Sequence, residues 1–230
     1  MSQRTDLLKQ ALNDDIYYPP QMKHIDRGIL GDGFYPGASG TTNITFPVGK
    51  VMLVGRDFGT MDYYERLCGN PPRSETALTW RHTKKIYLEI FDSADVWCTN
   101  YLMGVRVNGS AKGNVAPSMD PQSWLRYEAT CWDFFLKQVE LQKPALIIIF
   151  GDDNQIDLSR ASRIGSPLKA IPFADGEGSL CDHMFQLKSG PHTARIHFLK
   201  HPHSAIGPAN AAAVRAQAIF ANKQFHRIAH

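Results

Sequence analysis

The hydrophobic run from Ala145 to Phe150, ALIIIF, limits the fold of this chain more than any other stretch. It stands between Pro144 and Gly151, and two acids, Asp152 and Asp153, come next. An uninterrupted apolar run of this length is typical of a strand whose two faces are both buried, as in the middle of a parallel sheet. We therefore expect a sheet that is covered on both of its sides.

Other strand and helix patterns alternate along the chain, and this alternation predicts parallel strands joined by helices. Further strands are expected at 51–54, 96–99 and 194–199. Helices are expected at 75–91 and 208–222. The expected fold is therefore of the α/β class.

A long helix is expected to begin at Asp120 and Pro121 and to end at Pro144, because Asp caps helices and proline suits only their first turn. Its apolar residues recur in steps of four and three, which is the spacing of one helical face. The expected buried stripe is Leu125, Ala129, Trp132, Leu136 and Val139.

Length and composition fit one domain. The chain has 230 residues, of which 43 % are hydrophobic, and this is enough to cover a sheet on both faces. We expect a single three-layer α/β/α domain over 1–230, with a central, mostly parallel sheet. Residues 1–49, which become rich in glycine and proline toward their end, are expected to form an amino-terminal arm packed on it.

Charge and cysteine content narrow the possible functions. A formal charge of +3 allows a polyanionic partner, but only at a local basic surface. The 4 cysteines are too scattered for zinc or iron–sulfur ligands, so reduced thiols in the cytoplasm are expected. No apolar run approaches the roughly 20 residues of a membrane span. We expect a soluble, cytoplasmic protein.

Polar residues follow the predicted strands. Asp57 comes after the first, Asn100 ends the second, Asp152 and Asp153 follow the third, and His201 follows the fourth. The carboxyl ends of parallel strands lie along one edge of a sheet, so these side chains are expected to meet at a single crevice.

Several common chemistries lack their sequence patterns. No G-x-G-x-x-G follows Val54, and neither G-x-x-x-x-G-K-[ST] nor G-x-S-x-G occurs. His197, His201 and His203 lie close together, but no carboxylate or cysteine stands at a companion spacing. We expect no metal.

Three short motifs remain: GRDFG at 55–59, CTNYLMGVR at 98–106 and HPHSAIGPAN at 201–210, with LQKPALIIIFG at 141–151 between the last two. In this order they resemble the uracil-DNA glycosylase superfamily, over roughly residues 50–222. The resemblance implies an enzyme that hydrolyses the N-glycosidic bond of uracil or a related damaged base in DNA, as in base-excision repair. It implies DNA as partner, a monomer, and no cofactor.

The resemblance assigns catalytic and base-reading roles. Asp57 would position the attacking water and stabilise the sugar cation, Asn100 would read the base, and His201 would stabilise the leaving base as its negative charge grows. Structural alternatives stay open: Asp57 as a cap of a turn or of the next helix, and Asn100 as a turn residue that bonds its own backbone.

Other positions of the first motif would shape the base pocket. Gly59 stands where the strictest uracil-specific branch has a tyrosine, so exclusion of thymine does not follow. Phe58, where many members have proline, would stack on a base or pack below it. Trp80 is the first candidate for the stacking aromatic, with Tyr63 and Tyr64 as competitors.

The third motif would contact DNA. Ser204 comes one place later than the family's phosphate-binding serine, because His203 stands in that place. Ile206 would fill the gap left by the flipped base. Arg56, together with Lys200 and Arg215, would contact phosphates or simply be solvated. The four clustered cysteines of the iron–sulfur branches have no counterpart here.

Two other functions fit the same pattern. One is a catalytically inactive nucleic-acid-binding protein on the same fold, suggested by the departures at Phe58 and His203. The other is a small-molecule hydrolase or transferase with similar polar strand ends. Base release that depends on Asp57 or His201 would distinguish the glycosylase from both.

Overall fold

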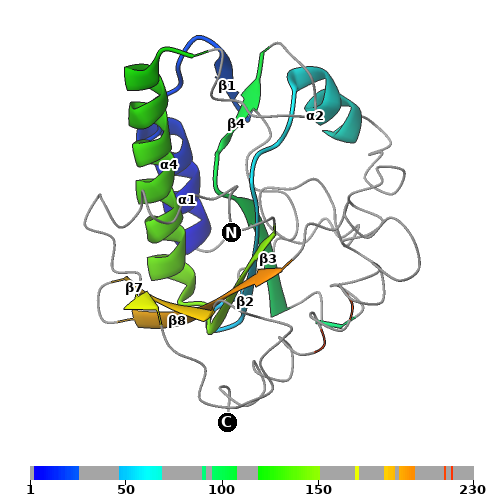
Figure 1. The fold of residues 1–230 in the computed structure, drawn as a ribbon, viewed down its shortest axis with the longest axis vertical. Coiled ribbons are helices and arrows are strands. Elements are labelled where there is room, and N and C mark those ends of the chain that lie inside the picture. Colours follow the sequence, from blue (N-terminus) through cyan, green and yellow to red (C-terminus); the bar gives the residue numbers. More distant parts are fainter. Residues whose placement is uncertain are drawn as a thin grey trace.

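A computed structural model describes residues 3–25, 47–68, 90–91, 95–107, 119–150, 169–170, 184–189 and 192–199, together with residues 215 and 219 (Figure 1). Within them the chain forms a sheet with helices packed against it, so the expectation of an α/β fold is confirmed.

The described strands include a six-stranded mixed sheet in the order β3-β2-β5-β8-β7-β6. Its first four strands run parallel, while β7 and β6 are antiparallel to their neighbours. The bounds are β2 Val51–Gly55, β3 Val96–Asn100, β5 Leu146–Phe150, β6 Lys169–Ala170, β7 Met184–Ser189 and β8 His192–Leu199. All four predicted strands are present, and the pair β6 and β7 was not predicted.

Strands β2, β3 and β5 are buried on both faces, which is why the sequences of β2 and β5 are continuous apolar runs. One row of side chains crosses four strands in register: Trp97, Met52, Ile147 and Ile196, each fully buried. This row faces the long helix, because Trp97 Nε1 donates a hydrogen bond of 3.2 Å to Gln138 Oε1.

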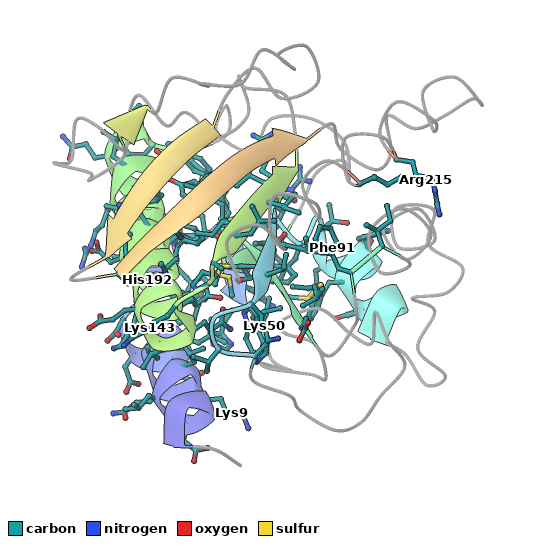
Figure 2. The ribbon with its side chains drawn as sticks, turned by 90° about the horizontal axis from the view of Figure 1, so that it is seen from below. Lys9, Lys50, Phe91, Lys143, His192 and Arg215 are labelled. Atoms are coloured by element: carbon teal, nitrogen blue, oxygen red, sulfur yellow. The ribbon has the colours of Figure 1, made fainter. Side chains whose placement is uncertain are left out.

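That helix is α4, Pro121–Gln142, and it begins and ends where the sequence predicted. Asp120 caps it by accepting a hydrogen bond of 2.8 Å from the Ser123 N–H, and this bond lowers the pKa of the Asp120 carboxyl. Lys143 ends it in the left-handed conformation, directly before Pro144. Figure 2 shows Lys143 and His192 near this end, where a His192 ring nitrogen lies 2.9 Å from the Pro144 carbonyl oxygen.

The buried face of α4 differs from the predicted stripe. Trp132 and Val139 are buried as predicted, and Leu136 is half-buried against the core, but Ala129 is only half-buried and Leu125 is 55 % exposed. Packing against both the sheet and a second helix gives α4 a wide aromatic face that the four-and-three spacing did not reveal. This face consists of Trp124, Tyr127, Cys131, Trp132, Phe134, Phe135, Gln138, Val139 and Gln142.

The second helix is α1, Gln3–Asp14, which lies beside α4 in Figures 1 and 2. Leu8 and Leu12 of α1 are buried in the common core. The chain then forms β1, Met22–His24, which pairs antiparallel with β4, Gly104–Arg106. Figure 1 shows β1 and β4 beyond the carboxyl end of β3, beside the short helix α2, Met61–Cys68.

The two remaining predicted helices lie mostly outside the described residues. Of 75–91, only Ile90 and Phe91 are described, and they form a turn and a bend. Of 208–222, only Arg215 and Ile219 are described, and both are helical. Among all the described helices, none combines the length and apolar character needed to cross a membrane.

Candidate functional site

The order of the parallel strands marks one point on the sheet edge. After β2 the chain adds β3 on one side, and the next parallel strand, β5, then pairs on the other side of β2. At such a switch the connections leave in opposite directions, and ligands of open α/β sheets bind outside the carboxyl ends of these strands. The loop that leaves β2, from Arg56 to Thr60, starts at this point.

The carboxylate of Asp57 is held within this loop. Its Oδ1 accepts a hydrogen bond of 2.7 Å from the Gly59 N–H and lies 3.8 Å from Nη2 of Arg106. The first contact is a turn bond and the second is an ion pair rather than a hydrogen bond. Both side chains are largely buried, at 13 % exposed for Asp57 and 9 % for Arg106.

Thr60, rather than Asp57, caps the helix that follows the loop. The Tyr64 N–H donates to the Thr60 carbonyl oxygen at 2.9 Å, and the Tyr63 N–H lies 3.4 Å from Thr60 Oγ1. The amino end of α2 is therefore capped by Thr60, while Asp57 stabilises the turn before it. A turn role for Asp57 is thus observed.

Asn100 ends β3 directly opposite Gly55, the last residue of β2. Two further bonds join the loops that follow: the Tyr101 N–H donates to the Gly55 carbonyl oxygen and the Leu102 N–H to that of Arg56, both at 2.8 Å. Asn100 is completely buried, and a Cβ atom on Gly55 would collide with its Oδ1. A base could meet this amide only after the groups that enclose it move.

Phe58 and Gly59 have structural roles in the same loop. Phe58 is buried, with its ring edge-on to that of Tyr64 at a centroid distance of 5.9 Å, so it packs in the core as a lone aromatic usually does. Gly59 has a φ of 79°, and a Cβ there would lie 3.2 Å from Cδ1 of Tyr63. Backbone conformation and this close ring are sufficient reasons for a glycine.

Among the other predicted site residues, the structure describes Arg56. Arg56 is half-buried beside Asp57. Outside the described residues lie Trp80, His201, Ser204 and Ile206, as well as Asp152, Asp153, Lys200 and His203. The strands that lead to two of these groups end side by side, because Phe150 of β5 is paired with Leu199 of β8.

Arg106 is the site residue that sequence reasoning missed. It is the last residue of CTNYLMGVR. The signal in the sequence was a cation at the end of an apolar segment, which could pair with an acid such as Asp57 at an earlier strand end. Its backbone is held from two sides. The Arg106 N–H donates to the Gly59 carbonyl oxygen at 2.9 Å, and the residue pairs with Met22 of β1.

Polar groups surround the backbone of Met103, which precedes β4. The Tyr18 hydroxyl donates to the Met103 carbonyl oxygen at 2.8 Å, and the Met103 N–H lies 3.4 Å from Cys131 Sγ. Burial raises the pKa of the Tyr18 and Tyr127 hydroxyls and raises that of the Cys131 thiol to about 12. These groups therefore stay protonated near neutral pH and serve as packing and hydrogen-bonding groups there.

In the described part of the chain, no three histidine, cysteine, aspartate or glutamate side chains gather closely enough to hold a metal ion. Comparison with known proteins adds no assignment: no protein-family model matches the chain, and no curated protein shows significant similarity to it.

Proposed function

We propose that this protein is a DNA glycosylase of the uracil-DNA glycosylase type, with a three-layer α/β/α domain, and that it hydrolyses the N-glycosidic bond of uracil or a related damaged base. One observation carries the proposal. The acidic strand end, Asp57, and the amide strand end, Asn100, come from adjacent parallel strands at the point where the strand order reverses.

Asp57 is suited to the hydrolytic step. Cleavage of an N-glycosidic bond passes through a sugar cation, and a fixed carboxylate stabilises that charge and orients the attacking water. Fixing matters because an already oriented group needs no rearrangement when the charge develops. The turn bond from Gly59 and the adjacent Arg106 supply this fixing here.

Asn100 and His201 complete the proposed chemistry. A side-chain amide offers one donor edge and one acceptor edge, which match the adjacent N–H and carbonyl of uracil. His201 would donate a hydrogen bond to the base as negative charge develops on it. It follows β8, which is two strands from β2 and therefore about 10 Å away along the sheet edge.

The test is base release from uracil-containing single- and double-stranded oligonucleotides. We expect Asp57→Asn and His201→Ala each to lower single-turnover release by about 100-fold or more. Asp15→Asn is the matched control, because Asp15 also carries a carboxylate in an ion pair but is half-exposed and lies outside the proposed site. Its Oδ2 lies 3.0 Å from Nζ of Lys137, a residue of α4. Release that is equal in wild type and both site variants, or absent from folded wild type, would contradict the proposal.

A catalytically inactive DNA-binding protein on the same fold is the second candidate. Two observations favour it: the Asp57 carboxylate is already engaged by its own turn and by Arg106, and the Asn100 amide is enclosed. Such a protein would bind DNA with an affinity that falls as salt rises, and would release no base. Binding that is insensitive to Asp57→Asn, without release, would identify this candidate.

A further inference from the structure

We infer that Arg106 is the residue that holds the Asp57 carboxylate in its orientation, and that it is therefore a positioning residue of the site. The catalytic consequence rests on the glycosylase function proposed above, whereas the positioning itself does not. Arg106 would act on the reaction through Asp57, whose carboxylate its guanidinium contacts.

The first argument is the placement of the Arg106 backbone. Arg106 pairs with Met22 of β1, and the next N–H, of Val107, donates to the Gln21 carbonyl oxygen at 3.0 Å. On its other side Arg106 donates to Gly59 and forms a parallel bridge with Thr60. The residue is thus tied both to the amino-terminal segment and to the loop that carries Asp57.

The second argument is charge. A carboxylate that is only 13 % exposed loses most of its hydration, and an opposite charge close by offsets part of that loss. Arg106 Nη2 lies 3.8 Å from the same Oδ1 that accepts the Gly59 N–H. Both contacts engage the same oxygen, so together they limit rotation of the carboxylate.

The third argument is that the backbone and side-chain contributions of Arg106 can be separated. Its N–H bond to Gly59 is independent of the side chain. Substitution of the side chain should therefore leave the pairing with the loop in place and remove the contact with the carboxylate. Because a small displacement of a reacting group slows chemistry more than binding, the loss should appear in the chemical step.

The structural test is amide hydrogen exchange of the folded, full-length protein. The Gly59 N–H, bonded to Asp57, should exchange about 10-fold faster in Arg106→Gln than in wild type, because the carboxylate is then freer to rotate away from it. Arg106→Lys, which keeps the charge but not the planar fork, should lie between them. Lys137→Gln, which breaks the exposed ion pair with Asp15, should leave Gly59 unchanged.

The functional test uses the same three variants with a uracil-containing oligonucleotide. Arg106→Gln should lower single-turnover release by about 10- to 100-fold while the Kd for DNA changes by less than about 3-fold, and Arg106→Lys should recover part of the rate. Unchanged Gly59 exchange in Arg106→Gln would overturn the inference. Faster exchange in Arg106→Gln with no release by wild type would uphold positioning and refute the glycosylase.

Discussion

Gly55 shows how one missing side chain permits the close approach of two strand ends. It lies opposite Asn100, and its Cα faces Oδ1 of that amide without room for a methyl group. The glycine looked like ordinary turn chemistry in the sequence, since it stands where the hydrophobic run ends. The need for glycine comes from the tertiary structure, because the side chain that blocks a methyl group belongs to Asn100, 45 positions farther along the chain.

Gly55→Ala should therefore destabilise the protein by about 1–3 kcal/mol, the usual cost of a group added to a packed site. Urea unfolding would measure this change. In an Asn100→Ala background the same substitution should cost less than about 1 kcal/mol, because the colliding oxygen is gone. An equal cost in both backgrounds would show that Asn100 is not the obstacle.

Cys131 gives a residue-scale prediction about pH. Burial raises the pKa of its thiol from 9.0 to about 12, so above pH 9 the unfolded chain loses a proton that the folded chain retains. The contribution of the protonated Cys131 thiol to stability is thus fully present below pH 9 and is lost as the pH rises toward 12. From pH 8 to pH 10, wild type should lose about 1 kcal/mol more than Cys131→Ala in urea unfolding. Identical losses would contradict the raised pKa.

At the scale of elements, local signals located α4 well and its buried face poorly. The cap at Asp120, the proline at 121 and the stop before Pro144 act on neighbouring backbone, so they are readable from the sequence. Which residues of α4 are buried depends on what packs against it. The buried face includes Phe134 and Tyr127, whose ring centroid lies 6.0 Å from that of Tyr18, whereas Leu125 is exposed.

The end of α4 offers a stabilising substitution. Lys143 has a φ of 47°, a left-handed conformation that costs a residue with a side chain about 1–2 kcal/mol. Glycine avoids this cost but loses more backbone entropy on folding, so the net gain is smaller. Lys143→Gly should therefore stabilise the protein by about 0.5–1 kcal/mol in thermal or urea unfolding. The same change inside the helix, Lys137→Gly, should destabilise it by about 1 kcal/mol. Destabilisation by both would refute the argument from backbone conformation.

At the scale of the whole molecule, the amino-terminal segment belongs to the same core as the sheet. Leu8 and Leu12 of α1 are buried with the residues of α4, Asp15 pairs with Lys137, and the Tyr17 N–H donates to Thr130 Oγ1 at 3.1 Å. Through β1 this segment also supports β4, which carries Arg106. The segment therefore connects overall stability to the candidate site.

Leu12→Ala should lower the stability of the whole protein by about 2–5 kcal/mol, because it leaves a cavity in the common core. Tryptophan fluorescence and far-ultraviolet circular dichroism should still report one shared transition in urea. Leu7→Ala is the matched control in the same helix, since Leu7 is 42 % exposed and should change stability by less than about 0.5 kcal/mol. Two separated transitions would show that α1 unfolds independently.

The sequence by itself determined the class of fold, the four parallel strands and both ends of α4. These follow from apolar runs, capping residues and proline, which act over a few residues of chain. It also placed Asp57 and Asn100 at strand ends along one edge of the sheet, while their catalytic roles stay predictions. Only the tertiary structure decided the pairing of β1 with β4, the ion pair of Arg106 with Asp57 and the buried face of α4. Each depends on segments far apart in the sequence, and no local pattern encodes which distant groups meet when the core closes.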